Sequence, residues 1–204
     1  IDPSGNGSGE QPIKGGDQTI EPVELNPLAD LSNDNTPTIS GSAEAGSTVT
    51  VVIKDKAGTV IETLNTKADS NGDWNVTAKE LADGEYSVSA SSVDTAGNAS
   101  APVSDTTQID ASATPVTLDP LAELSNDNTP TISGSAEAGS TVTVVIKDKA
   151  GTVIETLNTK ADSNGDWNVT AKELADGEYS VSASSVDTAG NASAPVSDTT
   201  QIDA

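Results

Sequence analysis

The sequence predicts an all-β protein made of two tandem domains that share one fold. Two observations carry this prediction. The segment from Leu31 to Ala111 recurs without a single change from Leu124 to Ala204, and a repeat of this length has the size of a small domain. Within each copy, apolar and polar residues alternate over short runs that turn residues separate, which is the pattern of half-buried β-strands.

The domain boundaries follow from the point at which the repetition begins. Residues 1–21 are glycine-rich, poor in apolar residues and unmatched by any later segment, so we interpret them as a flexible leader or a tag-derived segment. From Pro22 onward, PVELNPLAD resembles PVTLDPLAE, which begins at Pro115. The predicted domains are therefore residues 22–111 and 115–204.

Alternation locates the strands in chain order. Val49, Val51 and Ile53 alternate with more polar neighbours, and the same period of two runs from Trp74 and again from Tyr86. Sequences rich in Asp, Asn and Gly, which favour tight turns, separate these runs. The seven strands predicted for each copy, given for the first, are Pro22–Leu25, Pro37–Ser42, Thr48–Lys54, Thr59–Asn65, Trp74–Lys79, Tyr86–Val93 and Ala101–Ile109.

Seven short strands at this spacing are typical of an antiparallel β-sandwich of immunoglobulin-like type. Each copy has one Trp and one Tyr. Trp74 and Trp167 each begin an alternating strand, so we interpret them as core residues and not as platforms for stacking sugars. An odd number of strands running up and down places the two ends of a domain at opposite ends of the sandwich. Two such sandwiches should be arranged end to end, and each added copy should lengthen a rod.

Composition excludes several classes of function. The chain carries 32 acidic residues against 9 lysines and arginines, a net charge of −23, so we expect no binding of nucleic acid. It has no Cys or His, which removes disulfides, thiol or imidazole catalysis and zinc sites that need these ligands. We therefore expect no enzyme. No run of about 18 apolar residues is present, so no membrane insertion is expected either.

The acidic residues predict a calcium site at the joint between the copies. Calcium prefers six to eight oxygen ligands from carboxylates, amides and backbone carbonyls. The order of strands should bring acidic loops of both copies together across residues 111–114, a connection too short to let them separate. The predicted ligands are Asp30, Asp34, Asp83, Asp110, Glu137, Asp187 and Asn191.

Two simpler explanations stand beside the calcium site. Asp and Asn are common in turns because they bond to their own backbone, and acidity by itself keeps a protein soluble. A second local motif, Asp69–Asp73, has the oxygen spacing of the first half of a helix-loop-helix calcium loop. It lacks the later glutamate of such a loop in a helical context, so we interpret it as a hairpin turn.

Two longer phrases carry a family resemblance. The string NDNTPTISGSAEAGSTVTV from Asn33, followed by GDWNVTAKELADGEYSVSASSVDTAGNAS from Gly72, resembles the tandem bacterial immunoglobulin-like extender repeats of Gram-negative repeats-in-toxin adhesins and biofilm proteins. The likeness covers residues 22–204. It implies a calcium-rigidified stalk, secreted to the bacterial cell surface, that holds adhesive domains away from the cell. The expected partners are neighbouring identical repeats in the same chain, and the expected state is a monomer.

One other function stays open from the sequence, which is that each copy binds a carbohydrate or protein receptor. Verbatim repetition favours a spacer, because a binding face is usually displayed at a tip whereas a stalk benefits from uniform joints. Only 2% of the residues are aromatic, and exposed aromatic residues commonly anchor ligands. The spacer is therefore the leading prediction.

Overall fold

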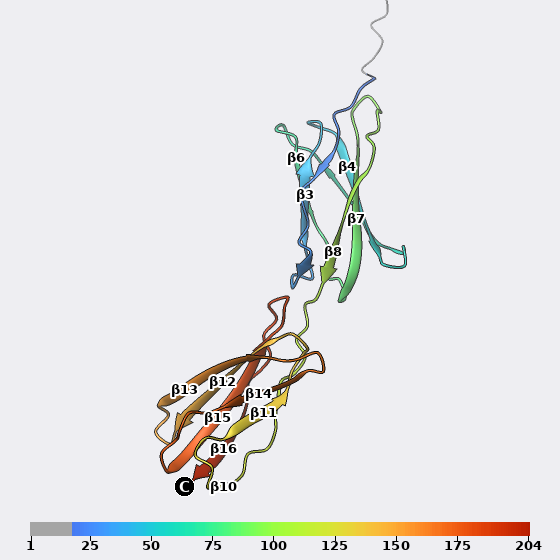
Figure 1. The fold of residues 1–204 in the computed structure, drawn as a ribbon. Coiled ribbons are helices and arrows are strands. Elements are labelled where there is room, and N and C mark those ends of the chain that lie inside the picture. Colours follow the sequence, from blue (N-terminus) through green and yellow to red (C-terminus); the bar gives the residue numbers. More distant parts are fainter. Residues whose placement is uncertain (1–17) are drawn as a thin grey trace, which may run out of the picture. The chain divides into compact units, whose positions relative to one another are not determined.

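The computed structural model describes residues 18–204, which form two β-sandwiches and contain no helix (Figure 1). Most of the predicted leader, residues 1–17, lies outside the described residues. In the described part of the chain, no helix has the length and apolarity needed to cross a bilayer. The predicted all-β class is confirmed.

The first sandwich consists of a three-stranded sheet, in the order β1-β3-β6, and a five-stranded sheet, in the order β2-β8-β7-β4-β5. Its strands are β1 (Glu24–Leu25), β2 (Leu31–Ser32), β3 (Thr38–Ser42), β4 (Thr48–Asp55), β5 (Val60–Lys67), β6 (Asp73–Thr77), β7 (Gly84–Val93) and β8 (Val103–Ile109).

The second sandwich repeats this topology, with sheets in the orders β9-β11-β14 and β10-β16-β15-β12-β13. Its strands are β9 (Thr117–Leu118), β10 (Leu124–Ser125), β11 (Thr131–Ser135), β12 (Thr141–Asp148), β13 (Val153–Lys160), β14 (Asp166–Thr170), β15 (Gly177–Val186) and β16 (Val196–Ile202).

Each copy has eight strands where the sequence predicts seven, and the additional one is only two residues long. In the second copy, β9 pairs antiparallel with β11, whereas β10 pairs parallel with β16. Both β9 and β10 therefore run in the same direction, as one pass of the chain that crosses from the smaller sheet to the larger one. The number of passes through the sandwich therefore stays odd. An odd number places the beginning and the end of a copy at opposite ends of its sandwich.

The second sandwich receives and releases the chain at opposite ends. Thr117 of β9 pairs with Ser135, where β11 ends, and the turn that follows leads to Thr141, the partner of Val186. Ile202 of β16 pairs with Gly177, the other end of β15. We refer to these as the Val186 end and the Gly177 end. The ten residues of β15 separate them, about 30 Å at the usual rise per residue.

The inward faces of the strands form the core of each sandwich. In the second copy the buried side chains include Ile132, Val144, Ile146 and Ile202, which occupy alternate strand positions. Trp74 and Trp167 are each 2% exposed, which confirms their predicted place in the core. Burial of these side chains in both sheets is what holds the sandwich closed.

Candidate metal centre

The chain divides by its contacts into two compact units. The first comprises the residues up to Leu28, Thr36–Lys79 and Tyr86–Thr107, and the second comprises Ala29–Asn35, Glu80–Glu85 and Gln108–Ala204. All seven ligands predicted from the sequence belong to the second unit. The candidate centre therefore lies within that unit alone.

Asp187 organises the turn at the Val186 end of the second sandwich. Its Oδ1 accepts the backbone N–H groups of Ala189 (2.9 Å) and Asn191 (2.8 Å), and its Oδ2 accepts the side-chain amide of Asn191 (2.9 Å). Gly190 supplies the left-handed conformation that closes the turn, with φ of 91°. Asp187 is only 9% exposed, so its position is fixed before any ligand arrives.

Glu137 lies in the turn that leaves β11 at the same end of the sandwich. The carbonyl of Glu137 accepts the N–H (3.0 Å) and the hydroxyl (2.6 Å) of Ser140, which closes this turn. The side-chain Oε2 is buried and has no hydrogen-bond partner. A buried carboxylate oxygen without a donor is costly, and a bound cation would satisfy it.

Asp110 directly follows β8 and completes the group. Its backbone N–H donates to the carbonyl of Ser32 (2.8 Å), so the residue continues the parallel pairing of β2 with β8. One carboxylate oxygen from each of Asp110, Glu137 and Asp187 lies within 4.8 Å of the others. The sequence predicted all three of these residues, and the structure brings them together.

The pKa values record how closely the charges approach. Burial raises the pKa of Asp110, and the negative charges of Asp187 and Asp83 add to the rise. Burial likewise raises the pKa of Glu137, with further contributions from Asp110 and Asp187. For Asp187 burial acts in the same direction, but the hydrogen bonds from Asn191 and Ala189 outweigh it and leave the pKa lowered. The charged forms of Asp110 and Glu137 are thus disfavoured, and a bound cation would stabilise them.

Asp83 stands beside this group without being one of the three. Its Oδ1 accepts the N–H of Ala111 (2.8 Å), and its Oδ2 accepts the hydroxyl of Ser112. These two donors, the hydroxyl above all, lower the pKa of Asp83 and keep it charged. Asp83 was predicted from the sequence, but Ser112 was not, because it resembles any other residue of a short connection.

The remaining predicted ligands have other surroundings. Asp30 and Asp34 are exposed and do not belong to the group within 4.8 Å. The backbone carbonyl of Asp30 accepts the N–H of Gln108 (3.1 Å) and so serves the pairing of β2 with β8. Asn191 lies at the group but points its amide nitrogen toward Asp187 and the carbonyl of Asp110 (2.6 Å).

The second local motif, Asp69–Asp73, forms a tight turn but not the predicted hairpin, because it connects β5 of the larger sheet to β6 of the smaller one. Oδ1 of Asp69 accepts the N–H groups of Asn71 (2.8 Å) and Asp73 (2.9 Å), and Gly72 has a φ of 84°. The side-chain oxygen is occupied by the backbone of its own turn, which is the ordinary role of an aspartate at this position.

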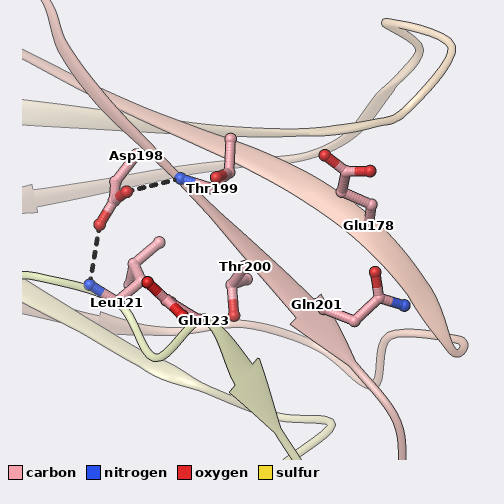
Figure 2. Close-up of a pocket in the computed structure, with 7 residues that line it drawn as sticks. All are labelled: Leu121, Glu123, Glu178, Asp198, Thr199, Thr200 and Gln201. Atoms are coloured by element: carbon pink, nitrogen blue, oxygen red, sulfur yellow. Dashed lines mark hydrogen bonds between the residues drawn. The ribbon is translucent and has the colours of Figure 1, made fainter.

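A second acidic region lies on the larger sheet of the second sandwich, in an open pocket of about 520 Å³ (Figure 2). Asp198 accepts the N–H groups of Leu121 (2.9 Å) and Thr199 (2.8 Å), and these bonds lower its pKa. Asp105 makes the same contacts in the first copy, to Leu28 and Thr106. These aspartates tie the crossing segment to the last strand. The pocket is lined by Leu121, Glu123, Glu178, Asp198, Thr199, Thr200 and Gln201.

Comparison with protein families matches the chain to the bacterial Ig-like domain, over residues 29–111 and again over residues 120–204. Comparison with curated proteins yields no match. The matched ranges each contain one sandwich apart from its first short strand.

Solved structures with similarity to the chain include a tetra-tandem repeat from the extending region of a large adhesion protein. It is 27% identical, with a TM-score of 0.41, and the match covers 89% of this chain and 48% of that one. A structure from work on the host cell surface retention of a 1.5-MDa bacterial ice-binding adhesin is 24% identical, with a TM-score of 0.42, and the match covers 89% of this chain and 64% of the chain in that structure. The fibronectin(III)-like modules of Clostridium thermocellum CbhA are 17% identical, with a TM-score of 0.43 and coverage of 88% and 93%. The chain thus spans about half the length of the first of these structures.

Proposed function

The chain belongs to the family of bacterial Ig-like domains, which it carries in two tandem copies, and we propose that it is an extender segment of a bacterial surface adhesin. In this role the copies form part of a stalk that projects adhesive domains away from the cell. The location is extracellular, at the cell surface, and the partners of each copy are the neighbouring copies in the same chain. The function is mechanical and requires no catalytic group.

The observation that carries this proposal is the path of the chain through one copy. In the second sandwich the chain arrives at the Val186 end and leaves from the Gly177 end. A domain with this path adds its own length to a chain of domains, whereas a domain with both termini at one end would not. Verbatim identity of residues 31–111 and 124–204 fits the same role, because identical copies give identical joints.

We further propose that calcium binds at Asp110, Glu137 and Asp187 and stiffens the joint. Three anionic groups with oxygens within 4.8 Å of one another repel in the absence of a cation. Hard carboxylate oxygens without any nitrogen or sulfur ligand favour calcium over transition metals. Asp110 lies on the segment that leaves the first copy, while Glu137 and Asp187 lie on turns of the second. A shared cation would therefore restrict the rotation of that segment.

Small-angle X-ray scattering in calcium and in chelator tests both parts of the proposal. We expect the maximum dimension to become shorter and more widely distributed when calcium is removed. The Asp110→Asn variant should behave in calcium as the wild type does in chelator. Asp203→Asn is the matched control, because Asp203 follows β16 as Asp110 follows β8, and it should keep the wild-type response.

Two outcomes would count against the proposal. Scattering profiles that are compact in both conditions would contradict the stalk itself. Identical, extended profiles with and without calcium would remove only the cation. A glycan array probed with the wild-type chain separates the stalk from the alternative of a carbohydrate-binding module, which predicts specific binding where the stalk predicts none.

A further inference from the structure

The side chain of Asn191 is surrounded by hydrogen-bond acceptors. Its Nδ2 lies 2.9 Å from Oδ2 of Asp187, 2.6 Å from the carbonyl oxygen of Asp110 and 3.3 Å from the carbonyl oxygen of Ser112. Only the nitrogen of the amide can occupy this position, because an oxygen there would face three other oxygens. A protonated amide nitrogen does not ligate a cation. Asn191 therefore acts at this site as a donor.

The segment that Asn191 contacts is also held through its donors. Oδ1 of Asp83 accepts the N–H of Ala111 (2.8 Å), and Oδ2 accepts the hydroxyl of Ser112. Asp83 thus bonds the donors of residues 111–112, while Asn191 bonds the carbonyls of residues 110 and 112. The two side chains use different groups of the same short segment, so neither contact competes with the other.

The two side chains that hold residues 110–112 come from different copies, Asp83 from the first and Asn191 from the second. Asp176, which corresponds to Asp83 in the second copy, accepts the N–H of Ala204 (2.9 Å) in the same way. Each copy therefore holds its own outgoing segment through an aspartate, whatever follows it in the chain. Asn191 adds further hydrogen bonds to this segment. It lies in the turn that Asp187 organises, and that turn belongs to the next copy.

We propose that Asn191 is a positioning residue that latches residues 110–112 in place without a cation. The latch sets the carbonyl of Asp110 against the 187–191 turn, and so keeps the Asp110 carboxylate near Glu137 and Asp187 before calcium binds. Preorganisation of this kind lowers the conformational entropy that cation binding would otherwise cost. The biological meaning of the latch rests on the proposed stalk function, but its existence does not depend on calcium.

Hydrogen exchange of the backbone amides of residues 111–114, measured by mass spectrometry, tests the latch. Residues 112–123 are unique in the chain, so peptides from this region can be assigned although the two copies are otherwise identical. The variants are Asn191→Ala and, as the matched control, Asn98→Ala in the corresponding turn of the first copy. Asn98 donates to Oδ2 of Asp94 (2.8 Å), so both variants lose the same bond within the turn.

In chelator, Asn191→Ala should accelerate exchange at residues 111–114 by about tenfold, the effect of losing roughly two hydrogen bonds. Asn98→Ala should change it less than about twofold. Equal exchange in the two variants would overturn the proposal. Asn191→Asp serves as a second variant, because it keeps the shape of the side chain but replaces the donor with an acceptor, and it should accelerate exchange at least as much.

The same exchange measurement with calcium added distinguishes whether Asn191 latches the segment or ligates the cation. Because the cation is assigned to three carboxylates, Asn191→Ala should still gain protection at residues 111–114 when calcium is added. Loss of that gain, with exchange in chelator unchanged, would make Asn191 a ligand and refute the latch. If the wild type gains no protection from calcium, the proposed calcium site fails, while the comparison in chelator still decides the latch.

Discussion

Replacing Gly134 with alanine tests whether the first short strand of a copy is held where the structure places it. Gly134 lies on β11 opposite Leu118 of β9. A Cβ at this position would lie 2.0 Å from the carbonyl oxygen of Thr117 and 2.8 Å from Cζ2 of Trp167. The first of these atoms is backbone and the second belongs to a buried ring, so neither moves without displacing other parts of the core.

The expected loss of stability can be assembled from these contacts. Overpacking a filled core costs about 1–3 kcal/mol, and losing the pairing of β9 removes roughly two backbone hydrogen bonds of about 1 kcal/mol each. Alanine also lowers the conformational entropy of the unfolded chain relative to glycine, which offsets about 0.4–1 kcal/mol of this loss. We expect a net loss of about 2–4 kcal/mol in the second copy, which lowers its melting temperature by about 10–30 °C.

Differential scanning calorimetry of the two-copy chain gives the readout, because the first copy stays unchanged and serves as an internal reference. Thr131→Ala, at an exposed position of the same strand, is the control and should cost less than about 0.5 kcal/mol. Gly41→Ala should move the same loss to the first copy, where the Cβ would lie 1.9 Å from the carbonyl oxygen of Glu24. A melting curve for Gly134→Ala within about 0.5 kcal/mol of the wild type would refute the placement of β9.

Three further predictions concern charge. At calcium concentrations about 100 times the dissociation constant, the free energy of unfolding of the wild type should rise by about 2.7 kcal/mol. In calorimetry, Glu137→Gln should abolish most of this rise, while the exposed control Glu123→Gln should keep it. The folded-state pKa of Asp198 is lowered, so its contribution to stability is present above the unfolded-state pKa and is lost as the pH falls through the folded-state value. In urea denaturation, the free energy of unfolding of Asp198→Asn should therefore decline less steeply in acid than that of the wild type. An equally steep decline would contradict the role of the Asp198 hydrogen bonds. The pKa values of Asp110 and Glu137 are raised, so in chelator these groups favour the folded state when protonated, and stability should increase as the pH falls through their folded-state values. Glu137→Gln should reduce that increase, and a variant that retains all of it would assign the effect elsewhere.

The strands were predictable because their pattern is local. Alternation around Val49–Ile53 and Tyr86–Ala90 follows from the pleat, and glycine-containing turns such as the one at Gly72 limit each run. The crossing strands β2 and β10 were not predictable, because two residues show no period and their pairing with β8 and β16 is parallel and distant in sequence. Asp198 was missed for a related reason, since it looks like any polar residue of an alternating strand.

The candidate centre divides in the same way. The order of the strands was sufficient to expect Asp110, Glu137 and Asp187 near one another, because each directly follows a strand or lies in the next turn. The sequence did not separate these three from Asp30 and Asp34, which are equally acidic and lie in an equally polar loop. It also gave no indication of which end of the Asn191 amide would face the group.

The sequence by itself determined the architecture, the number of copies and the excess of negative charge, because strand period, verbatim repetition and composition are properties of the chain alone. Only the tertiary structure decided which acidic residues meet, that Glu137 keeps a buried oxygen without a donor, and that Asn191 offers its nitrogen. Those features depend on distances of a few ångströms between turns far apart in the sequence. Such distances are set by how the two sheets pack, which no local pattern records.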